Sequence, residues 1–125
     1  PVTELIQDES WLQGDLIKSV QQRGAAIIKA RGASSAASAA NAVVDTIQRL
    51  NNPTPDGEWF STAIPSDGSY GIPEGIMFSY PLRSLGNYEY EVVQSLELNE
   101  FGQQKVQAPR EELEMEREAV SDIMG

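Results

Sequence analysis

One stretch of the sequence consists almost entirely of very small side chains, and its residue types are suited to binding a small anion. It reads RGASSAASAAN over residues 31–41, and every residue from 33 to 40 is Ala or Ser. Glycine often ends a helix, and serine often caps the start of the next one. A helix that starts here would offer free N–H groups, serine hydroxyls and the positive end of its dipole to a small anion. Alternatively, the small residues serve close helix packing, and spacing alone does not separate the two interpretations.

Other kinds of site have less support in the sequence. The chain contains no cysteine and no histidine, which excludes a thiol nucleophile, thiolate metal ligands and an imidazole general base. Neither glycine signature of phosphate binding, GxGxxG nor GxxxxGK[ST], occurs. The acidic pair Asp8 and Glu9 and the acidic run at residues 111–118 are more typical of solvated helix faces than of a metal site. We therefore predict no metal site and no nucleotide site of the chain's own.

Length and charge restrict the class of protein. A chain of 125 residues with 40% hydrophobic residues is of the common size for one globular domain. The net charge of −10 disfavours nucleic acid and anionic membrane as partners, because the field of the protein repels both. No apolar run approaches the roughly 20 residues that span a bilayer, and the first residues lack a basic stretch followed by an apolar one. These features predict a soluble, cytoplasmic protein.

The pattern of apolar residues places the candidate site between two helices. Apolar residues recur at helical spacing over residues 9–30, with a break expected near Gly14 or Gly24. Gly32 marks a helix end, and a second helix follows from Ser34 or Ser35 to about residue 50. The sequence Asn-Asn-Pro at residues 51–53 ends this second helix.

The period then changes to that of strands. Alternation predicts strands at residues 58–65, 76–82 and 88–93, with a long glycine-rich connection at 66–75. Turn residues at 85–87 make the second and third strands an antiparallel hairpin. A last helix runs from a cap at Asn99 toward residue 124, and Pro109 should kink it or begin a new segment. The fold class is α+β: two N-terminal helices, a three-stranded antiparallel sheet and a long C-terminal helix.

Four segments carry a resemblance to a known family: VQQRGAAIIKARGASSAASAANA at 20–42, GEWFSTAI at 57–64, SDGSYGIPEG at 66–75 and FSYP at 78–81. They resemble the substrate-binding, C-terminal domain of NAD-dependent malate dehydrogenase of the cytosolic type, which many bacteria also have. Lactate dehydrogenases share that fold, but a bulky aromatic residue and a threonine typically follow the glycine that aligns with Gly32. This chain has Ala33 and Ser34 there, which favours malate over lactate.

The resemblance implies that residues 1–125 form a single substrate-binding and dimerisation domain, and that the N-terminal dinucleotide-binding domain is absent from this chain. The parent enzyme would interconvert malate and oxaloacetate by hydride transfer with NAD. Its catalytic histidine, aspartate and arginines lie upstream in the family, so this chain holds no catalytic residue and should be inactive alone. By the same resemblance, the substrate-facing residues are Gly32, Ala33, Ser34 and Ser35, and Gly24 lies near the cofactor.

Partners also follow from the resemblance. In the family, the helices that match residues 9–51 pack against a partner subunit and against the dinucleotide-binding domain, which predicts a homodimer through the first two helices. Since no cysteine lies near the C-terminus, the thiol-switched, NADP-dependent chloroplast form is disfavoured. The alternative is a free-standing acidic interaction or dimerisation module derived from the enzyme. The reading frame upstream of residue 1 would distinguish the two.

Overall fold

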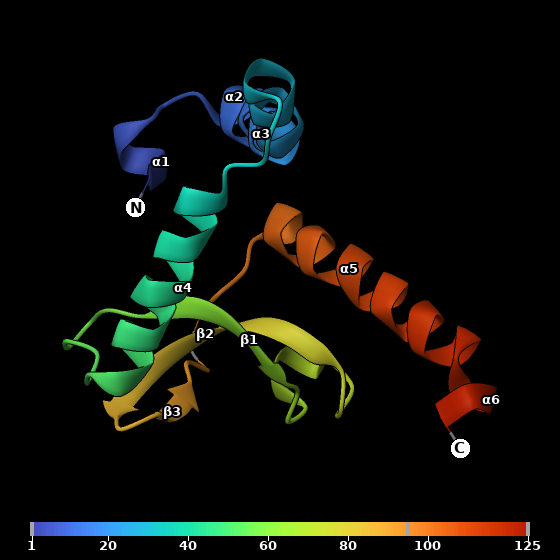
Figure 1. Ribbon diagram of the computed structural model, residues 1–125. Coiled ribbons are helices and arrows are strands. Elements are labelled where there is room, and N and C mark those ends of the chain that lie inside the picture. Colours follow the sequence, from blue (N-terminus) through green and yellow to red (C-terminus); the bar gives the residue numbers. More distant parts are fainter. Residues whose placement is uncertain (1, 95, 125) are drawn as a thin grey trace. The chain divides into compact units, whose positions relative to one another are not determined.

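The computed structural model describes residues 2–94 and 96–124. By its internal contacts the chain divides into two compact units, residues 1–44 and 45–125. The helices and strands follow one another in the order expected for an α+β domain, with helices first, a sheet in the middle and helices last (Figure 1). The α+β class predicted from the sequence is therefore confirmed, whereas the assignment of all 125 residues to a single domain stays a prediction.

The first unit is helical. It holds α1 (Val2–Leu5), α2 (Glu9–Gln13), α3 (Asp15–Arg31) and the beginning of α4 (Ala36–Asn51). The helix predicted over residues 9–30 is thus broken at Gly14, and it continues without interruption through Gly24. A side chain at position 14 would bring its Cβ within 3.0 Å of the Ser10 carbonyl oxygen, so the joint between α2 and α3 suits glycine. α1 was not predicted.

The second unit is built on a three-stranded antiparallel sheet of β1 (Phe60–Pro65), β2 (Met77–Gly86) and β3 (Glu89–Val92), in that order. Leu82 of β2 lies opposite Phe60 of β1 and opposite Val92 of β3. The predicted strands and their antiparallel hairpin are confirmed. The turn itself is the pair Asn87 and Tyr88, whose φ values of 51° and 66° are those of a type I′ turn, so it lies slightly later than expected.

The core of this unit lies against the sheet. Alternate residues of β1 and β2 are buried, as the period of two predicts. The buried hydrophobic residues are Phe60, Ile64, Ile72, Ile76, Tyr80 and Leu82. Leu50 near the end of α4 packs against this cluster, as do Val106 and Leu113 of the last long helix.

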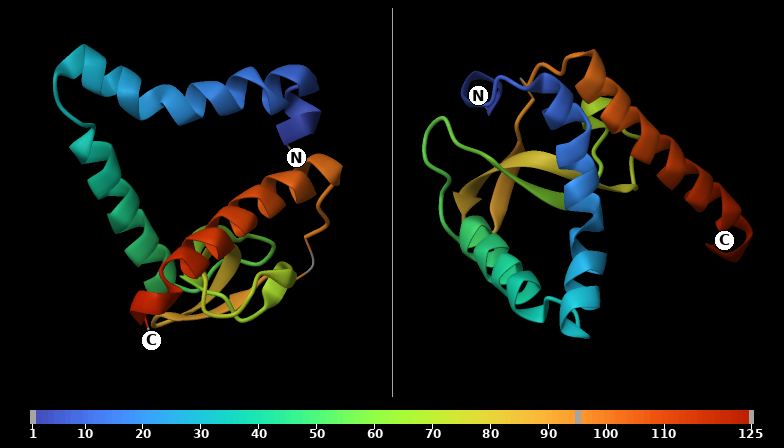
Figure 2. Two further views of the ribbon diagram at one scale, coloured as in Figure 1. Left: turned by 90° about the vertical axis from the view of Figure 1, so that its right-hand side faces the viewer. Right: turned by 90° about the horizontal axis from the view of Figure 1, so that it is seen from above.

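That last long helix is α5 (Glu100–Ala119), and it is followed by α6 (Ser121–Met124). Asn99 caps α5 as predicted, since its side-chain oxygen accepts a hydrogen bond of 2.9 Å from the Gly102 amide. Pro109 lies inside α5, which continues past it, so the expectation that a new segment begins there is wrong (Figure 2). Pro109 is exposed, so water can reach the carbonyl group that loses its helical partner. The helix instead ends at Ala119, with Val120 as its C-terminal cap.

Candidate functional site

The predicted substrate-facing residues lie together at the turn between α3 and α4. Gly32 ends α3 in the left-handed conformation, with φ of 72°, and its amide donates a hydrogen bond of 2.8 Å to the Ile28 carbonyl. Ala33 and Ser34 continue the turn, and Ser35 directly precedes the first residue of α4. Gly32, Ala33 and Ser34 are exposed and Ser35 is half-buried. The sequence thus predicted both the helix end and the helix start correctly.

Two further side chains fix this turn, and the sequence did not single out either of them for that role. The Arg31 Nη1 atom donates a long hydrogen bond of 3.4 Å to the Ser34 carbonyl oxygen. Ser38 donates from both its amide, at 2.8 Å, and its hydroxyl, at 2.9 Å, to the Ser35 carbonyl oxygen. Because these contacts depend on side-chain conformations, residue spacing gave no signal for them.

The turn between α3 and α4 has the chemical features of a binding site for a small anion. The first turn of any α-helix has N–H groups without helical partners, and the helix dipole places partial positive charge there. The largest side chain among residues 32–35 is that of serine, so the space above the backbone stays open. Among the described residues, no side chain that could act as a general base is bonded to this turn, and Arg31 is the charged side chain that forms a hydrogen bond to it. The arrangement can therefore bind a ligand but supplies no proton transfer.

Gly24, predicted to lie near the cofactor, sits in the middle of α3. Glycine costs about 1 kcal/mol relative to alanine inside a helix. At Gly24 the backbone has ordinary helical φ, and a Cβ would meet no atom within 4 Å in the described chain. Every other described glycine either has positive φ or would bring a Cβ within 3.3 Å of a neighbour. Packing within this unit therefore does not explain Gly24.

Hydrogen bonds of three side chains hold the glycine-rich connection at 66–75 in place. Ser66 and Tyr80 are buried, and their hydroxyl oxygens are 2.6 Å apart. The Ser66 hydroxyl also lies 2.9 Å from the Ile72 carbonyl oxygen, and the Tyr70 hydroxyl donates to the Val93 carbonyl. Tyr70 therefore anchors this connection to Val93, which directly follows β3.

Acidic side chains of the second unit form hydrogen bonds and an ion pair within the chain. Asp67 accepts a hydrogen bond of 2.9 Å from the Ser69 amide, and hydrogen bonds from the Ser69 side chain and backbone hold the pKa of that carboxyl below its usual range. On α5, Arg110 and Glu114 form an ion pair of 2.8 Å at i,i+4 spacing. Within the part of the chain that the structure describes, no group of three or more acidic side chains is placed to hold a metal ion. In those same residues, no helix is long and apolar enough to cross a membrane.

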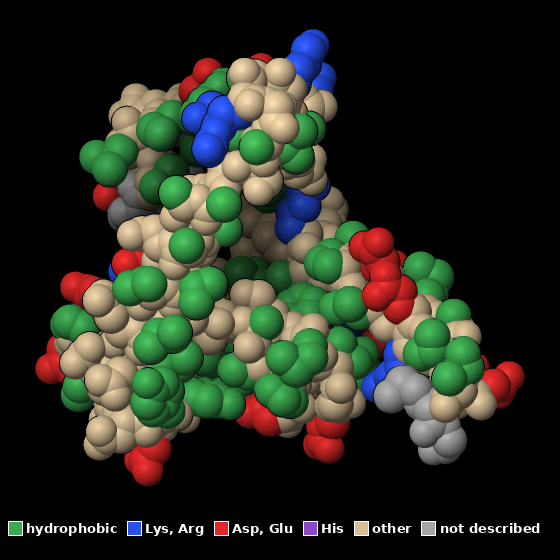
Figure 3. Space-filling view, in the orientation of Figure 1, with side chains coloured by type: hydrophobic (Ala, Val, Ile, Leu, Met, Phe, Trp, Pro, Cys, Tyr) green, Lys and Arg blue, Asp and Glu red, His purple; other side chains and the backbone are tan. Residues whose placement is uncertain are grey.

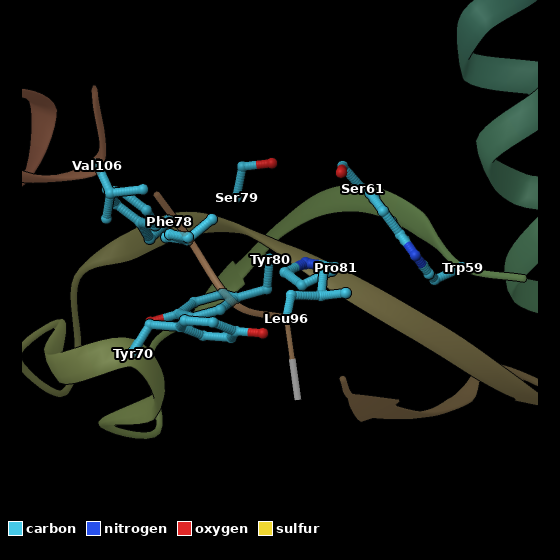
Figure 4. Close-up of a pocket in the computed structure, with 10 residues that line it drawn as sticks. Trp59, Ser61, Tyr70, Phe78, Ser79, Tyr80, Pro81, Leu96 and Val106 are labelled. Carbon is cyan, nitrogen blue, oxygen red and sulfur yellow. The ribbon is translucent and has the colours of Figure 1, made fainter. Parts of the chain in front are cut away.

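The second unit also contains a cavity of about 170 Å³ beside the sheet (Figure 4). Its lining is mostly aromatic and aliphatic, with the hydroxyls of Ser61 and Ser79 as the small polar groups. No charged side chain lines it, so it lacks the groups that would recognise a carboxylate. The cavity is lined by Trp59, Ser61, Tyr70, Phe78, Ser79, Tyr80, Pro81, Leu96, Leu98 and Val106.

The chain is similar to known proteins in its family model, its sequence and its structure. The family model for the lactate/malate dehydrogenase, alpha/beta C-terminal domain matches residues 1–123. A malate dehydrogenase of Protochlamydia amoebophila is 51% identical over 125 residues, which is 99% of this chain and 38% of that protein. The crystal structure of malate dehydrogenase from Naegleria fowleri has a TM-score of 0.83 at 45% identity, covering 93% of this chain and 35% of that one.

A lactate dehydrogenase is a more distant structural relative. The Trichomonas vaginalis enzyme, solved in complex with NADH and oxamate, has a TM-score of 0.80 at 26% identity, covering 92% of this chain and 35% of that one. Helices, a three-stranded antiparallel sheet and a long last helix together define the α+β domain that such dehydrogenases carry at their C-terminal end. The chain belongs to the lactate/malate dehydrogenase family, as its C-terminal domain. It spans little more than a third of the length of the relatives it matches.

Proposed function

We propose that this chain is the substrate-binding domain of an NAD-dependent malate dehydrogenase, which interconverts malate and oxaloacetate by hydride transfer. The observation that carries the proposal is the turn at Gly32, Ala33, Ser34 and Ser35, which is open, small and placed at a helix start. It is supported by 51% identity to a protein named malate dehydrogenase, against 26% identity to the lactate dehydrogenase. Alanine and serine after the glycine leave room for the second carboxylate of a dicarboxylic acid.

We propose NAD as the cofactor, and we assign only a small part of its binding site to this chain. One of the structural relatives was solved in complex with NADH. Gly24 has open space above its Cα and no packing reason to be glycine, which fits the close approach of a cofactor or of the domain that binds it. When bound, NAD supplies the hydride acceptor for malate oxidation. The diphosphate would be held outside this chain, since the chain has neither phosphate-loop signature.

The proposal assigns binding, and not proton transfer, to these 125 residues. A general base must take the hydroxyl proton of malate as the hydride leaves, and this chain contains no histidine. We propose that the base, its aspartate partner and the substrate-binding arginines lie in the dinucleotide-binding part of the protein. The chain by itself would then bind weakly and turn over nothing.

A homodimer formed through the first two predicted helices, residues 9–51, is part of the same proposal. Large apolar side chains are exposed on α3 and α4, where a subunit interface would cover them. They are Val20, Ile28, Val43, Val44 and Ile47. We also propose a cytoplasmic location, because the resemblance is to the cytosolic type of the enzyme.

The test is a substitution that fills the space at the turn. In the full-length enzyme, Ser34→Tyr should raise the KM for oxaloacetate or lower kcat strongly, because the aromatic ring would occupy the volume reserved for the second carboxylate. Ser34→Ala is the matched control, since it removes the hydroxyl and keeps the space. Unchanged kinetics in Ser34→Tyr would remove Ser34 from the substrate site.

A further inference from the structure

The basic residues of the chain are distributed very unevenly. Residues 16–44 contain four basic side chains and no acidic one, a net charge of +4. The rest of the chain has five basic and 19 acidic residues, a net charge of −14. The four are Lys18, Arg23, Lys29 and Arg31, all on α3 and all exposed. In Figure 3, Lys and Arg side chains lie over the region that Figure 1 labels α3, and most of the visible Asp and Glu side chains lie around the sheet and α5.

Arg31 brings this positive charge to the candidate site. It is the last residue of α3, and its guanidinium Nη1 atom lies 3.4 Å from the Ser34 carbonyl oxygen. A backbone carbonyl leaves the charge of the guanidinium uncompensated. Within the first unit, no described carboxylate forms an ion pair with Arg31. Arg31 is therefore an exposed cation with no carboxylate partner among the described residues of the first unit, beside the turn that the sequence singles out for an anion.

We infer that Arg31, reinforced by Lys29 and the other cations of α3, attracts the dicarboxylate substrate to the turn by long-range electrostatics. This inference rests on the proposed function. The net charge of −10 carried by these 125 residues opposes the approach of a dianion. A cationic stretch beside the turn reverses that repulsion where the substrate must arrive. Its effect is on the rate of encounter, so it acts on kcat/KM and leaves kcat unchanged.

The size of the effect follows from Coulomb attraction and ionic screening. For a dianion about 10 Å from the guanidinium in water, loss of one positive charge should lower kcat/KM about threefold at an ionic strength of about 10 mM. At about 0.15 M the same loss should be about 1.5-fold, and at about 1 M it should vanish. The salt dependence separates attraction at a distance from a direct contact, which screening affects much less.

The experiment measures oxaloacetate reduction by the full-length enzyme and its Arg31→Gln variant across this range of ionic strength. Each variant is compared with the wild type at the same salt concentration. Arg31→Lys keeps the charge and should restore kcat/KM. Lys18→Gln removes an equal charge from the first turn of the same helix, about 20 Å along α3 from Arg31 at 1.5 Å per residue, and should change kcat/KM for oxaloacetate much less.

Four results would overturn the inference. A defect of equal size at every salt concentration would mean that Arg31 acts through the hydrogen bond to the turn. A loss confined to the KM for NADH would mean that the cations serve the dinucleotide. A loss of kcat alone would place Arg31 in the chemical step. A full-length wild-type enzyme that reduces no oxaloacetate would overturn the proposed function, and this inference with it.

Discussion

Replacing Gly24 by alanine tests two effects of this glycine separately. One is its effect on the stability of α3, and the other is its role in contacts within the full-length enzyme. Gly24 lies within α3, and an added methyl group meets nothing within 4 Å in the described chain. Glycine to alanine at a helical position that tolerates the side chain stabilises by about 0.5–1 kcal/mol. We therefore expect Gly24→Ala to stabilise α3 by about this amount in the isolated 125-residue chain.

The assay is urea unfolding of the isolated chain followed by far-ultraviolet circular dichroism, with amide hydrogen exchange to assign the change to α3. The adjacent Ala25→Gly variant is the matched control, because Ala25 is exposed on the same helix. Its free energy of unfolding should be about 1 kcal/mol lower than that of the wild type. Destabilisation by Gly24→Ala would show that a neighbour within the chain already occupies the space, and the reasoning would fail.

The same substitution should have the opposite consequence in the full-length enzyme. If a cofactor or the domain that binds it approaches Gly24 closely, an added methyl group overpacks the contact, at a cost of about 1–3 kcal/mol. We expect kcat/KM to fall at least about fivefold while the stability of α3 does not decrease. Unchanged kinetics would remove Gly24 from any such contact.

Two more predictions concern the glycine-rich connection at 66–75. Tyr80→Phe removes a buried hydroxyl that lies 2.6 Å from the Ser66 hydroxyl and leaves no cavity. The free energy of unfolding, measured by chemical denaturation, should therefore fall by about 1 kcal/mol. A variant as stable as the wild type would show that this hydroxyl contributes nothing. The lowered pKa of Asp67 means that its ionised form stabilises the folded state above the ordinary value of 3.8, and that this contribution is lost as pH falls through the lower, folded value. Asp67→Ala should therefore be less stable than the wild type at pH 6, with the difference shrinking below about pH 4, and a difference that does not change with pH would contradict the assignment.

Much of the fold follows from local patterns in the sequence. Alternation placed the strands and their core residues, because one face of the sheet packs against the core. Asn99 and Gly32 were read correctly because capping depends on one residue and its immediate neighbours. Local sequence does not distinguish Gly14 from Gly24 as the point where the first predicted helix breaks. The structure distinguishes them, because a Cβ atom at position 14 would lie 3.0 Å from the Ser10 carbonyl oxygen, whereas one at position 24 would meet no atom within 4 Å. The end of α5 after Ala119 is marked by neither glycine nor proline, so the sequence contains no signal for it.

The candidate site was predictable in position and not in detail. The small residues and the glycine located the turn, but the hydrogen bonds from Arg31 and Ser38 depend on side-chain conformations that spacing does not encode. The basic stretch at residues 16–44 was visible in the sequence. It gained a meaning only when the structure placed the Arg31 guanidinium beside the Ser34 carbonyl.

The measurement that tests the account most directly is oxaloacetate-dependent oxidation of NADH in three samples. They are the full-length protein, the 125-residue chain alone, and this chain mixed with the separately expressed dinucleotide-binding part. The account predicts activity in the first and third samples and none in the second. Activity of the chain alone would contradict the assignment of proton transfer to residues outside it, and an inactive full-length protein would favour a binding or dimerisation module over an enzyme.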